Sequence, residues 1–266
     1  MPIRRRLKKW LKPQPHSSQQ DSISQPIYTL NDWSWKAEEL KSMEYWRKMH
    51  QDWTDNIEEL GNGIYRVPLF EEAWYKKWLQ EIALLHNWIL NNHIDSEQPN
   101  SMHNYGLMAT ELGLEALFNQ WITEIGCHIS ALLYPEFGTL DHCHAFWVNY
   151  GKHTDQSLGF HADDSEVTFN FCLGDDFQGS ELYFQGRRCF EHLQSPHHPH
   201  EEIIVEHIPG TCIVHAGLHR HGVYPILKGN RQNLILWGRS SEYRRDFQRQ
   251  NCYDWCGLSP KDGSIQ

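Results

Sequence analysis

The sequence predicts an α+β fold in which helices come first along the chain and a β-core of the jelly-roll type follows them. Before residue 134, apolar residues recur three and four apart through two long segments, as they do on one face of a helix. After that point, short segments rich in Val, Ile, Phe, Tyr and Trp alternate with Gly, Asp and Pro. Many short strands with tight turns are typical of a sandwich or jelly roll, so we expect an eight-stranded, double-sheet core with helices packed on its outside.

The length and composition fit a folded domain with its own core. The chain has 266 residues, of which 39% are hydrophobic and 13% aromatic, enough to bury a core without cross-links. The formal net charge is -10, and an acidic body is a poor general surface for nucleic acid. The sequence contains no apolar run of about eighteen residues, so no segment is predicted to span a bilayer.

Residues 1–30 are predicted to form a basic flexible tail and a polar linker. The first twenty residues contain six Lys or Arg and no acidic residue. The opening MPIRRRLKKWLKP places apolar residues on one helical face, with Arg and Lys around them, until Pro13 ends any helix. We interpret the segment as a solvated tail. Membrane contact, nuclear import and a mitochondrial presequence stay open as alternatives.

The cysteines predict reduced thiols and an intracellular, cytoplasmic location. Their number is odd, they are scattered, and no signal peptide is recognised ahead of them. Only Cys252 and Cys256 are close together, and a C-x3-C pair by itself is a weak indication of zinc, so we interpret both as ordinary thiols. The full set is Cys127, Cys143, Cys172, Cys189, Cys212, Cys252 and Cys256.

Residues 31–133 are predicted to form a helical support region. FEEAWYKKWLQEIALLHNWILNN is expected to be one long amphipathic helix, and ATELGLEALFNQWITEIGCHISALLYP a second that ends at Pro135. The stretch GIYRVPLF is a strand-like exception. Between the two helices, QPNSMHNYG is polar and turn-rich, and its residues could line a site without showing chemistry of their own.

Residues 134–245 are predicted to form the jelly-roll core, and residues 246–266 a C-terminal tail. Six segments have the length and composition of strands: AFWVNY, EVTFNFCL, SELYFQG, EEIIVEHI, TCIVHAG and QNLILWGRS. The histidine-rich HLQSPHHPH, residues 192–200, has two prolines in a polar stretch. We interpret it as an exposed loop rather than a metal-binding tract.

A histidine and an aspartate form the first part of a candidate metal site. In GFHADDSEVTFNF, His161 and Asp163 stand two residues apart, so on a strand both side chains would project from one face into the interior. One more histidine completes the two-histidine, one-carboxylate set that leaves positions open on Fe(II). Asp164 would point to the opposite face, and we expect it to be replaceable.

The third ligand is expected from HAGLHRHGVYPILKGNRQNLILW, where His215, His219 and His221 compete. An oxygenase that uses 2-oxoglutarate needs a buried cation for the distal carboxylate, which Arg binds bidentately, and Arg231 lies ten residues after His221. With Pro225 and a turn at LKGN between them, these two would lie on consecutive strands, about 4.8 Å apart if paired. We interpret His215 and His219 as core histidines or as neighbours of the ligands.

These motifs resemble a known family. H-x-D followed by H-G-V-x-P-x-x-x-G-x-R-x-N-L is similar to the iron and 2-oxoglutarate-dependent dioxygenases of the prolyl and lysyl hydroxylase superfamily, with the spacing of the lysyl hydroxylase branch. AFWVNY and GFHADDSEVTFNFCLGDDFQGSELYF resemble its core strands. QPNSMHNYG, ELGLEAL and ALLYPE resemble the 2-oxoglutarate and iron-dependent oxygenase domain-containing group. The resemblance covers roughly residues 60 to 241 and implies a double-stranded β-helix, or jelly roll.

The resemblance also implies a site. Three side chains would bind iron, one would anchor 2-oxoglutarate, and two more would line the site and contact this co-substrate. Asn149 departs from the pattern, because lysyl hydroxylases show an Arg there, and this leaves contacts at that position open. The implied metal ligands are His161, Asp163 and His221, and the implied co-substrate residues are Arg231, Tyr150 and Asn170.

The function implied by the resemblance is a Fe(II)- and 2-oxoglutarate-dependent dioxygenase. It would hydroxylate an unidentified substrate, a peptidyl side chain being favoured, and convert 2-oxoglutarate and O2 to succinate and CO2, with L-ascorbate as a candidate reductant for the iron. The nucleic-acid demethylase branch carries a second Arg where this chain has Trp237, which disfavours nucleic acid. Two alternatives stay open: a non-catalytic jelly roll that binds metal or 2-oxoglutarate as a sensor or interaction module, and a zinc hydrolase, which lacks an evident general base.

Overall fold

The computed structural model describes residues 56–70, 72–93, 98–174, 176–246 and 256. The predicted basic tail and linker at residues 1–30 lie outside the described residues. So does the predicted C-terminal tail, apart from residues 246 and 256. Within the described ranges, the helices are too short or too polar to cross a bilayer.

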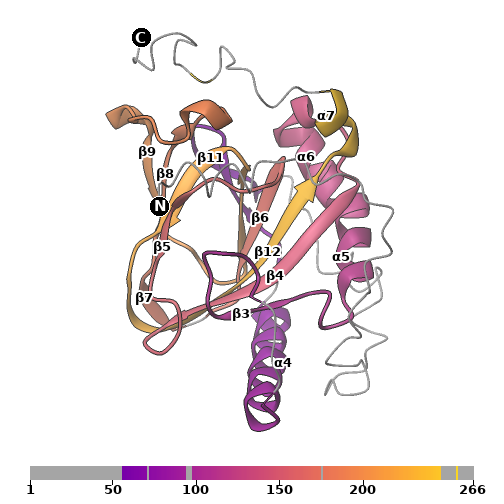
Figure 1. The fold of residues 1–266 in the computed structure, drawn as a ribbon, viewed down its shortest axis with the longest axis vertical. Coiled ribbons are helices and arrows are strands. Elements are labelled where there is room, and N and C mark those ends of the chain that lie inside the picture. Colours follow the sequence, from indigo (N-terminus) through magenta and orange to yellow (C-terminus); the bar gives the residue numbers. More distant parts are fainter. Residues whose placement is uncertain (1–55, 71, 94–97, 175, 247–255, 257–266) are drawn as a thin grey trace, which may run out of the picture.

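The described chain folds into two antiparallel sheets that pack face to face (Figure 1). The predicted double-sheet jelly-roll core is thus confirmed, with more strands than the eight expected. The larger sheet contains β1 (Glu58–Gly61), β2 (Ile64–Pro68), β3 (Gly106–Met108), β4 (His142–Gly151), β6 (Val167–Cys172), β7 (Phe177–Gly179), β10 (Thr211–Ala216) and β12 (Ile226–Arg239). The smaller sheet contains β5 (Leu158–His161), β8 (Leu182–Arg187), β9 (Glu202–Val205) and β11 (His219–Val223).

The strand order places the middle of the larger sheet against the smaller sheet. The larger sheet runs β1-β2-β10-β6-β12-β4-β3, with β7 paired to β12, and the smaller runs β5-β11-β8-β9. Alternate residues of β12 belong to different cores: Leu234 and Leu236 pack in the cluster beneath the helices, and Ile235 and Trp237 pack in the cluster between the sheets. This alternation allows both faces of the larger sheet to be buried.

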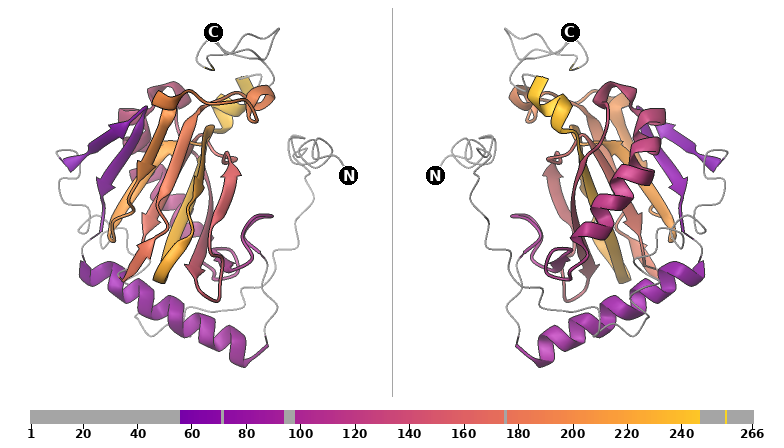
Figure 2. Two further views of the ribbon diagram at one scale, coloured as in Figure 1. Left: turned by 90° about the vertical axis from the view of Figure 1, so that its left-hand side faces the viewer. Right: turned by 90° about the vertical axis from the view of Figure 1, so that its right-hand side faces the viewer.

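Helices cover the outer face of the larger sheet. The first predicted helix is α4 (Glu72–Asn91), and Figure 2 shows it crossing the end of the sheet. The second begins at Glu115 instead of Ala109, because residues 109–113 form turns. It consists of α5 (Glu115–Trp121), a π-helical turn (Ile122–Gly126) and α6 (Cys127–Leu133). A Cβ at Gly126 would lie 3.0 Å from Ile122 Cδ1 and 3.1 Å from the Trp121 ring, so a glycine fits the packing at this turn.

The region predicted as helical support also contributes three strands to the larger sheet. The strand-like exception GIYRVPLF contains β2, which pairs with β10, and β3 pairs with β4. Three strands of the core, β5, β7 and β11, have no counterpart among the six predicted segments. They are short or polar, so composition alone does not mark them as strands.

Two expectations about the last strands were wrong. Strands β11 and β12 are consecutive, but they lie in different sheets, so they face each other across the core instead of pairing 4.8 Å apart. The segment LKGN is not a turn. It lies within β12 and pairs with β7 through an irregular register, with Gly229 in the left-handed region at φ 76°.

Candidate metal centre

Two histidines and an aspartate meet where β5 lies beside β11. His161 and His221 are cross-strand partners, and their ring centres are 4.3 Å apart. The Asp163 carboxylate approaches both, with one oxygen 3.4 Å from His161 Nε2 and the other 3.8 Å from His221 Nε2. One ligand atom from each residue lies within 4.8 Å of the others, a spacing that a single metal ion can bridge. The structure therefore brings together the three residues that the sequence singled out.

Asp163 is positioned by tertiary contacts, and not by the strand alternation that the sequence suggested. Strand β5 ends at His161, so Asp163 is not held by strand alternation. Its backbone N–H donates to Gly217 O at 2.8 Å, and Thr168 Oγ1 donates to Asp163 Oδ2 at 2.6 Å. The Thr168 hydroxyl also lies 2.8 Å from Ser165 Oγ. The carboxylate is thus oriented by contacts from β6 and from the residue after β10.

Both candidate histidine ligands have their Nδ1 atoms occupied by backbone carbonyls. His161 Nδ1 lies 2.8 Å from Gly159 O, and His221 Nδ1 lies 2.9 Å from His219 O. A carbonyl only accepts hydrogen bonds, so each Nδ1 carries the proton and each Nε2 keeps a lone pair. These lone pairs are available to a metal ion, and the carbonyls fix the ring orientation as a metal-binding histidine requires.

The protonation states of the cluster also suit a divalent cation. Burial lowers the pKa of His221 well below its ordinary value and keeps this imidazole neutral. Burial raises the pKa of the Asp163 carboxyl, whereas His221 and His161 lower it when they carry a proton, and the net direction is below the ordinary value. Neutral imidazole and ionised carboxylate are the forms that bind metal.

The neighbouring candidates do not join the cluster. His215 is fully buried, with Nδ1 2.9 Å from Ala216 O and Nε2 3.9 Å from Asp163 Oδ2, so it is a neighbour of the carboxylate. His219 is buried, and neither of its ring nitrogens has a hydrogen-bond partner among the described residues. Asp164 points away, as expected, but it forms ion pairs with Arg239 at 3.0 Å and Arg244 at 3.1 Å. That Asp164 is replaceable without loss of the metal cluster stays a prediction, and its replacement would remove these ion pairs.

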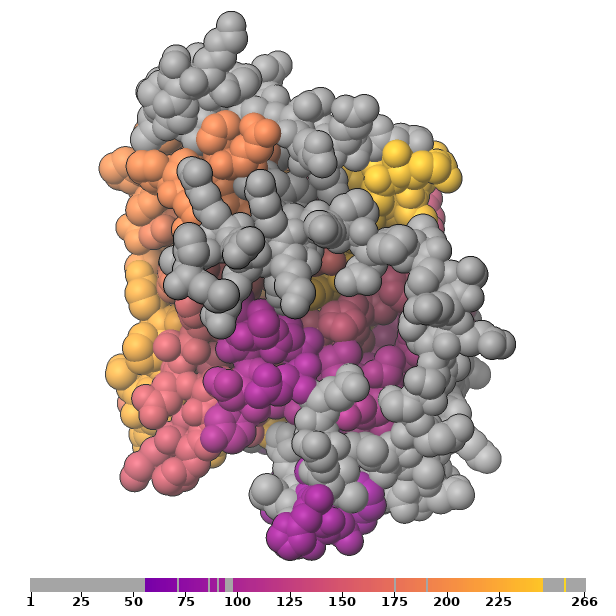
Figure 3. Space-filling view, in the orientation of Figure 1, coloured from indigo at the N-terminus to yellow at the C-terminus, as the bar shows by residue number. Residues whose placement is uncertain are grey.

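A pocket adjoins the cluster. The polar segment QPNSMHNYG contributes to its wall, as the sequence suggested, and in Figure 3 this segment lies on the face turned to the viewer. Besides the three cluster residues and the small Ala162, the pocket is lined by apolar side chains (Phe146, Leu158, Leu182, Val223, Ile235, Trp237) and by Asn100, Met102, His103, Tyr150, Thr168 and Asn170. A mainly apolar wall with a few convergent polar groups is typical of small-molecule sites.

Arg231 lies next to the pocket without lining it. Arg231 and Tyr150 are cross-strand partners on β12 and β4, and the guanidinium carbon lies 4.6 Å from the centre of the Tyr150 ring. The side chain is completely buried and donates to Ser180 O, while its Nε has no hydrogen-bond partner in the part of the chain that the structure describes. Across the described ranges, no carboxylate lies within ion-pair distance of Arg231. A buried cation without a counter-ion is costly, and an anionic ligand would offset that cost.

The other predicted site residues are also at the pocket. Tyr150 and Asn170 both line it, and Asn170 Oδ1 accepts a hydrogen bond from Asn233 Nδ2. His103 was not predicted, yet its Nε2 lies 3.0 Å from the Tyr150 hydroxyl. Thr168 was also missed, although it stands two residues before Asn170 on β6 and alternation would have placed both on one face. The sequence carries no comparable signal for His103.

Acidification is expected to destabilise the metal-free chain. Burial is the main cause that lowers the pKa of His103 and of His144 from 6.5 to about 4. Between these values the unfolded chain binds protons that the folded chain does not. The stabilisation is therefore complete above pH 6.5 and is lost as pH falls toward 4, by up to ~1.4 kcal/mol per pH unit for each histidine. Urea unfolding in chelator at about pH 7 and 5 measures this slope.

The variant His144→Phe tests the share of one histidine in this slope. The His144 ring lies among aromatic neighbours, 5.4 Å from the centres of both Phe146 and Trp237, so a phenyl ring fits its surroundings. We expect the variant to show a shallower pH dependence than the native chain. An unchanged slope would contradict the lowered pKa of His144.

The fold and the cluster together define a class of protein. The fold consists of two antiparallel sheets packed face to face, and the cluster between them consists of two histidines and one carboxylate. Proteins of this class are jelly rolls with a two-histidine, one-carboxylate metal-binding set. Residues 17–139 match the family model of an OGFOD2-like domain, which ends before the cluster. The 2-oxoglutarate and iron-dependent oxygenase domain-containing protein ICU11 of Arabidopsis thaliana is 37% identical over 235 residues, 87% of this chain and 59% of that protein. The 2-oxoglutarate and iron-dependent oxygenase domain-containing protein 2 of Mus musculus is 38% identical over 184 residues, 68% of this chain and 50% of that protein.

The chain is a homologue of the 2-oxoglutarate and iron-dependent oxygenase domain-containing proteins. It spans about half to two thirds of the length of the curated relatives that it matches. Among solved structures, it is similar to a prolyl 4-hydroxylase from Phytophthora capsici, with 14% identity, a TM-score of 0.49, and coverage of 77% of this chain and 65% of the other.

Proposed function

We propose that the chain is a Fe(II)- and 2-oxoglutarate-dependent dioxygenase. The observation that carries the proposal is the convergence of His161, Asp163 and His221 within 4.8 Å, with both Nδ1 atoms bound to carbonyls and both Nε2 lone pairs left for a metal. Two imidazoles and one carboxylate on one side of an ion suit Fe(II) and leave positions for further ligands. These three side chains would hold the iron, which would supply the chemistry that links oxidative decarboxylation of 2-oxoglutarate by O2, giving succinate and CO2, to hydroxylation of a substrate.

The protein side chains would hold and orient the co-substrate. Arg231 supplies a buried positive charge without an ion-pair partner in the described part of the chain, which suits the distal carboxylate of 2-oxoglutarate. The pocket reaches Tyr150 and stops short of Arg231, so we propose that the carboxylate meets the Tyr150 hydroxyl and that a shift of this ring opens the way to the guanidinium. Asn170 lines the pocket and would contact the co-substrate from β6.

Succinate production tests the proposed activity. The purified chain is incubated with Fe(II), 2-oxoglutarate and O2, with and without ascorbate, and succinate is quantified against a sample without iron. We expect iron-dependent succinate that falls to background in His161→Ala, because this change removes one ligand atom. Turnover that persists in His161→Ala would refute the assigned centre. Binding of 2-oxoglutarate without O2 consumption, against a broad panel of peptides, would favour a sensor instead.

The substrate that we propose is a peptidyl side chain, which follows from the resemblance to lysyl hydroxylases. The apolar wall between the sheets suits the aliphatic part of such a side chain. Mass spectrometry of proteomes with and without the protein would identify products that have gained one oxygen atom. If the gain of oxygen is found only among small molecules, the proposal of a peptidyl substrate is contradicted.

We also propose an intracellular location for the protein. It is supported by the six described cysteines, all of which are free thiols.

Thr168 is expected to influence iron affinity through Asp163. Thr168→Val keeps the shape of the side chain but removes the hydroxyl that donates to Asp163 Oδ2 at 2.6 Å. Loss of such a supporting hydrogen bond lowers metal affinity by about 10- to 100-fold. The iron concentration that gives half-maximal succinate formation measures the effect. Ser165→Ala is the matched control, since it leaves the bond from Thr168 to Asp163 in place, and equal iron affinity in Thr168→Val and native protein would contradict this role.

A further inference from the structure

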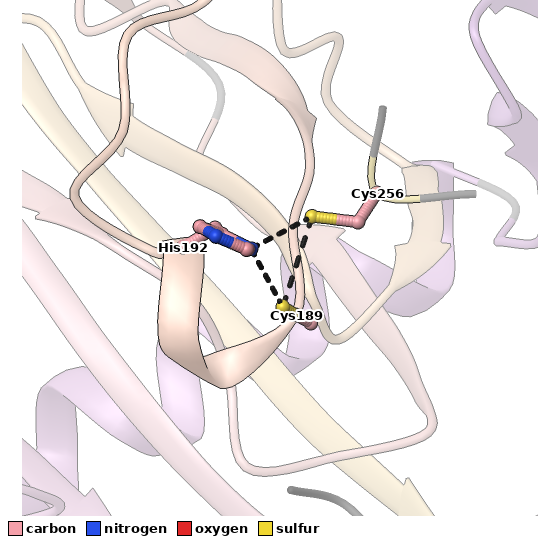
Figure 4. Close-up of side chains that lie close together, drawn as sticks. All are labelled: Cys189, His192 and Cys256. Carbon is pink, nitrogen blue, oxygen red and sulfur yellow. Dashed lines mark hydrogen bonds between the residues drawn. The ribbon is translucent and has the colours of Figure 1, made fainter. Parts of the chain in front are cut away.

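A second cluster of metal-binding side chains lies away from the proposed iron centre. Cys189, His192 and Cys256 lie close together, and Figure 4 shows the His192 imidazole turned toward both sulfur atoms. The two Sγ atoms are 3.7 Å apart, and His192 Nδ1 lies 3.1 Å from Cys189 Sγ and 3.4 Å from Cys256 Sγ. None of these residues takes part in the proposed dioxygenase function, so the cluster has to be explained by a different role.

Local backbone structure brings the first two residues together. Cys189 precedes the 3-10 helix η4 (Phe190–His192), and His192 N–H donates to Cys189 O at 3.0 Å. In a 3-10 helix, side chains three residues apart eclipse one another, so Cys-x-x-His at this turn presents sulfur and imidazole nitrogen on one side. Cys256 completes the cluster from 64 residues further along the chain. The histidine-rich segment 192–200 is therefore not solely the exposed loop that the sequence suggested.

We propose that Cys189, His192 and Cys256 bind a structural zinc ion. Tetrahedral zinc with Zn–S near 2.3 Å and Zn–N near 2.0 Å places two sulfur ligands about 3.8 Å apart, and sulfur and nitrogen about 3.5 Å apart. The observed separations of 3.7, 3.4 and 3.1 Å need adjustments of a few tenths of an ångström at most. The fourth position is left for water or a further protein ligand. The proposed role of Cys256 as a zinc ligand replaces its interpretation as an ordinary thiol. Cys252 lies outside the described residues.

Burial and charge agree with such a site. Cys189 and Cys256 are 2% and 0% exposed and form a small buried cluster of their own, separate from both main cores. Two thiolates, a neutral imidazole and Zn2+ sum to zero charge, so the occupied site can be buried without a further counter-ion.

The proposed zinc ion would link Cys256, which is distant in the sequence, to the strand β11, which carries His221. The segment between β8 and β9 is tied to β11 by Arg220, whose Nη1 donates to Leu193 O and Ser195 O. His192 belongs to the same segment, so a metal ion bound there would connect Cys256 to this segment and, through Arg220, to β11. The inference is independent of the proposed dioxygenase activity, because it uses other residues and another metal.

Cobalt(II) binding to the full chain under reducing conditions tests the proposal. A thiolate-bound cobalt ion gives a sulfur-to-metal charge-transfer absorption in the near ultraviolet, which a site of two histidines and a carboxylate cannot give. We expect this absorption in the native chain, displacement of that cobalt by one equivalent of zinc, and loss of the absorption in both Cys189→Ser and Cys256→Ser. The control Cys127→Ser changes a thiol that lies elsewhere and bonds to Leu140 O, and it should keep the absorption. His161→Ala should also keep it.

The native chain alone is enough to refute the proposal. Absence of the charge-transfer absorption, or its loss in Cys127→Ser alone, would overturn the assignment. A digest under nonreducing conditions in which the peptide that contains Cys189 is linked to the peptide that contains Cys256, with no metal bound to the chain, would show that these two residues form a disulfide instead. If a serine variant does not fold, alkylation of the native chain serves in its place: zinc should protect Cys189 and Cys256 from the reagent, and a chelator should remove that protection.

Discussion

Asp163→Asn is expected to abolish iron binding and succinate formation, while Asp164→Asn keeps both. The two aspartates are adjacent, but only Asp163 faces His161 and His221, at 3.4 and 3.8 Å. An amide has the same shape and lacks the charge that a divalent ion requires from this position. Iron content after dialysis and succinate formation measure the outcome, and iron-dependent turnover in Asp163→Asn would refute the centre.

The control Asp164→Asn has an expected effect of its own. The Asp164 side chain is 41% exposed and pairs with Arg239 and Arg244, the second of which lies on α7 (Ser241–Asp246). Exposed ion pairs contribute up to about 1 kcal/mol, so we expect a small loss in the free energy of unfolding and unchanged iron binding. Loss of iron in both variants would show that the effect is not specific to the ligand.

Arg231→Met is expected to remove 2-oxoglutarate binding while the chain stays folded and retains iron. The native guanidinium is buried, has an unpartnered Nε and has no ion pair within the described ranges, so an apolar side chain of similar length removes a costly buried charge. Each charge-assisted hydrogen bond contributes about 1.5 to 3 kcal/mol, so losing two should weaken 2-oxoglutarate binding by at least about a hundredfold. Calorimetric titration of 2-oxoglutarate into the metal-loaded chain without O2 measures this.

Arg220→Met is the matched control because the residue type and burial are the same. Arg220 donates to the backbone oxygens of Gln185, Gly186, Leu193 and Ser195, so its role is to hold the β8-to-β9 segment. We expect a loss of several kcal/mol in the free energy of unfolding, since four carbonyls lose their donor. Equal 2-oxoglutarate affinity in native protein and Arg231→Met would refute the anchor.

The sequence predicted that His161, Asp163 and His221 lie together, but partly for a wrong reason. The spacing of His161 and Asp163 attracted attention because residues two apart on a strand share a face. In the structure β5 ends at His161, and Asp163 is held by Gly217 O and Thr168. These contacts come from residues that only the tertiary fold brings near. The residue types were therefore informative, whereas the local geometry was not.

The strand of the candidate third ligand was expected from the spacing of His221 and Arg231, because its polar composition does not mark it as a strand. Strand β11 reads His-Arg-His-Gly-Val, which does not resemble a buried strand, yet all five residues are buried. Backbone carbonyls make this possible, because they accept from Arg220 and lie beside His221 Nδ1. The cluster of Cys189, His192 and Cys256 was missed for a related reason, since 64 residues separate its last two members.

The division of the proposed site between two sheets sets a length requirement on its ligand. His161 and His221 belong to the small sheet, whereas Arg231 and Tyr150 belong to the large one, and packed sheets lie about 10 Å apart. A diacid that binds a metal at one end and a guanidinium at the other must bridge that gap. Under the proposed function, a four-carbon homologue is too short to reach both walls at once, so the thickness of the sandwich itself discriminates between dicarboxylates that carry the same charge.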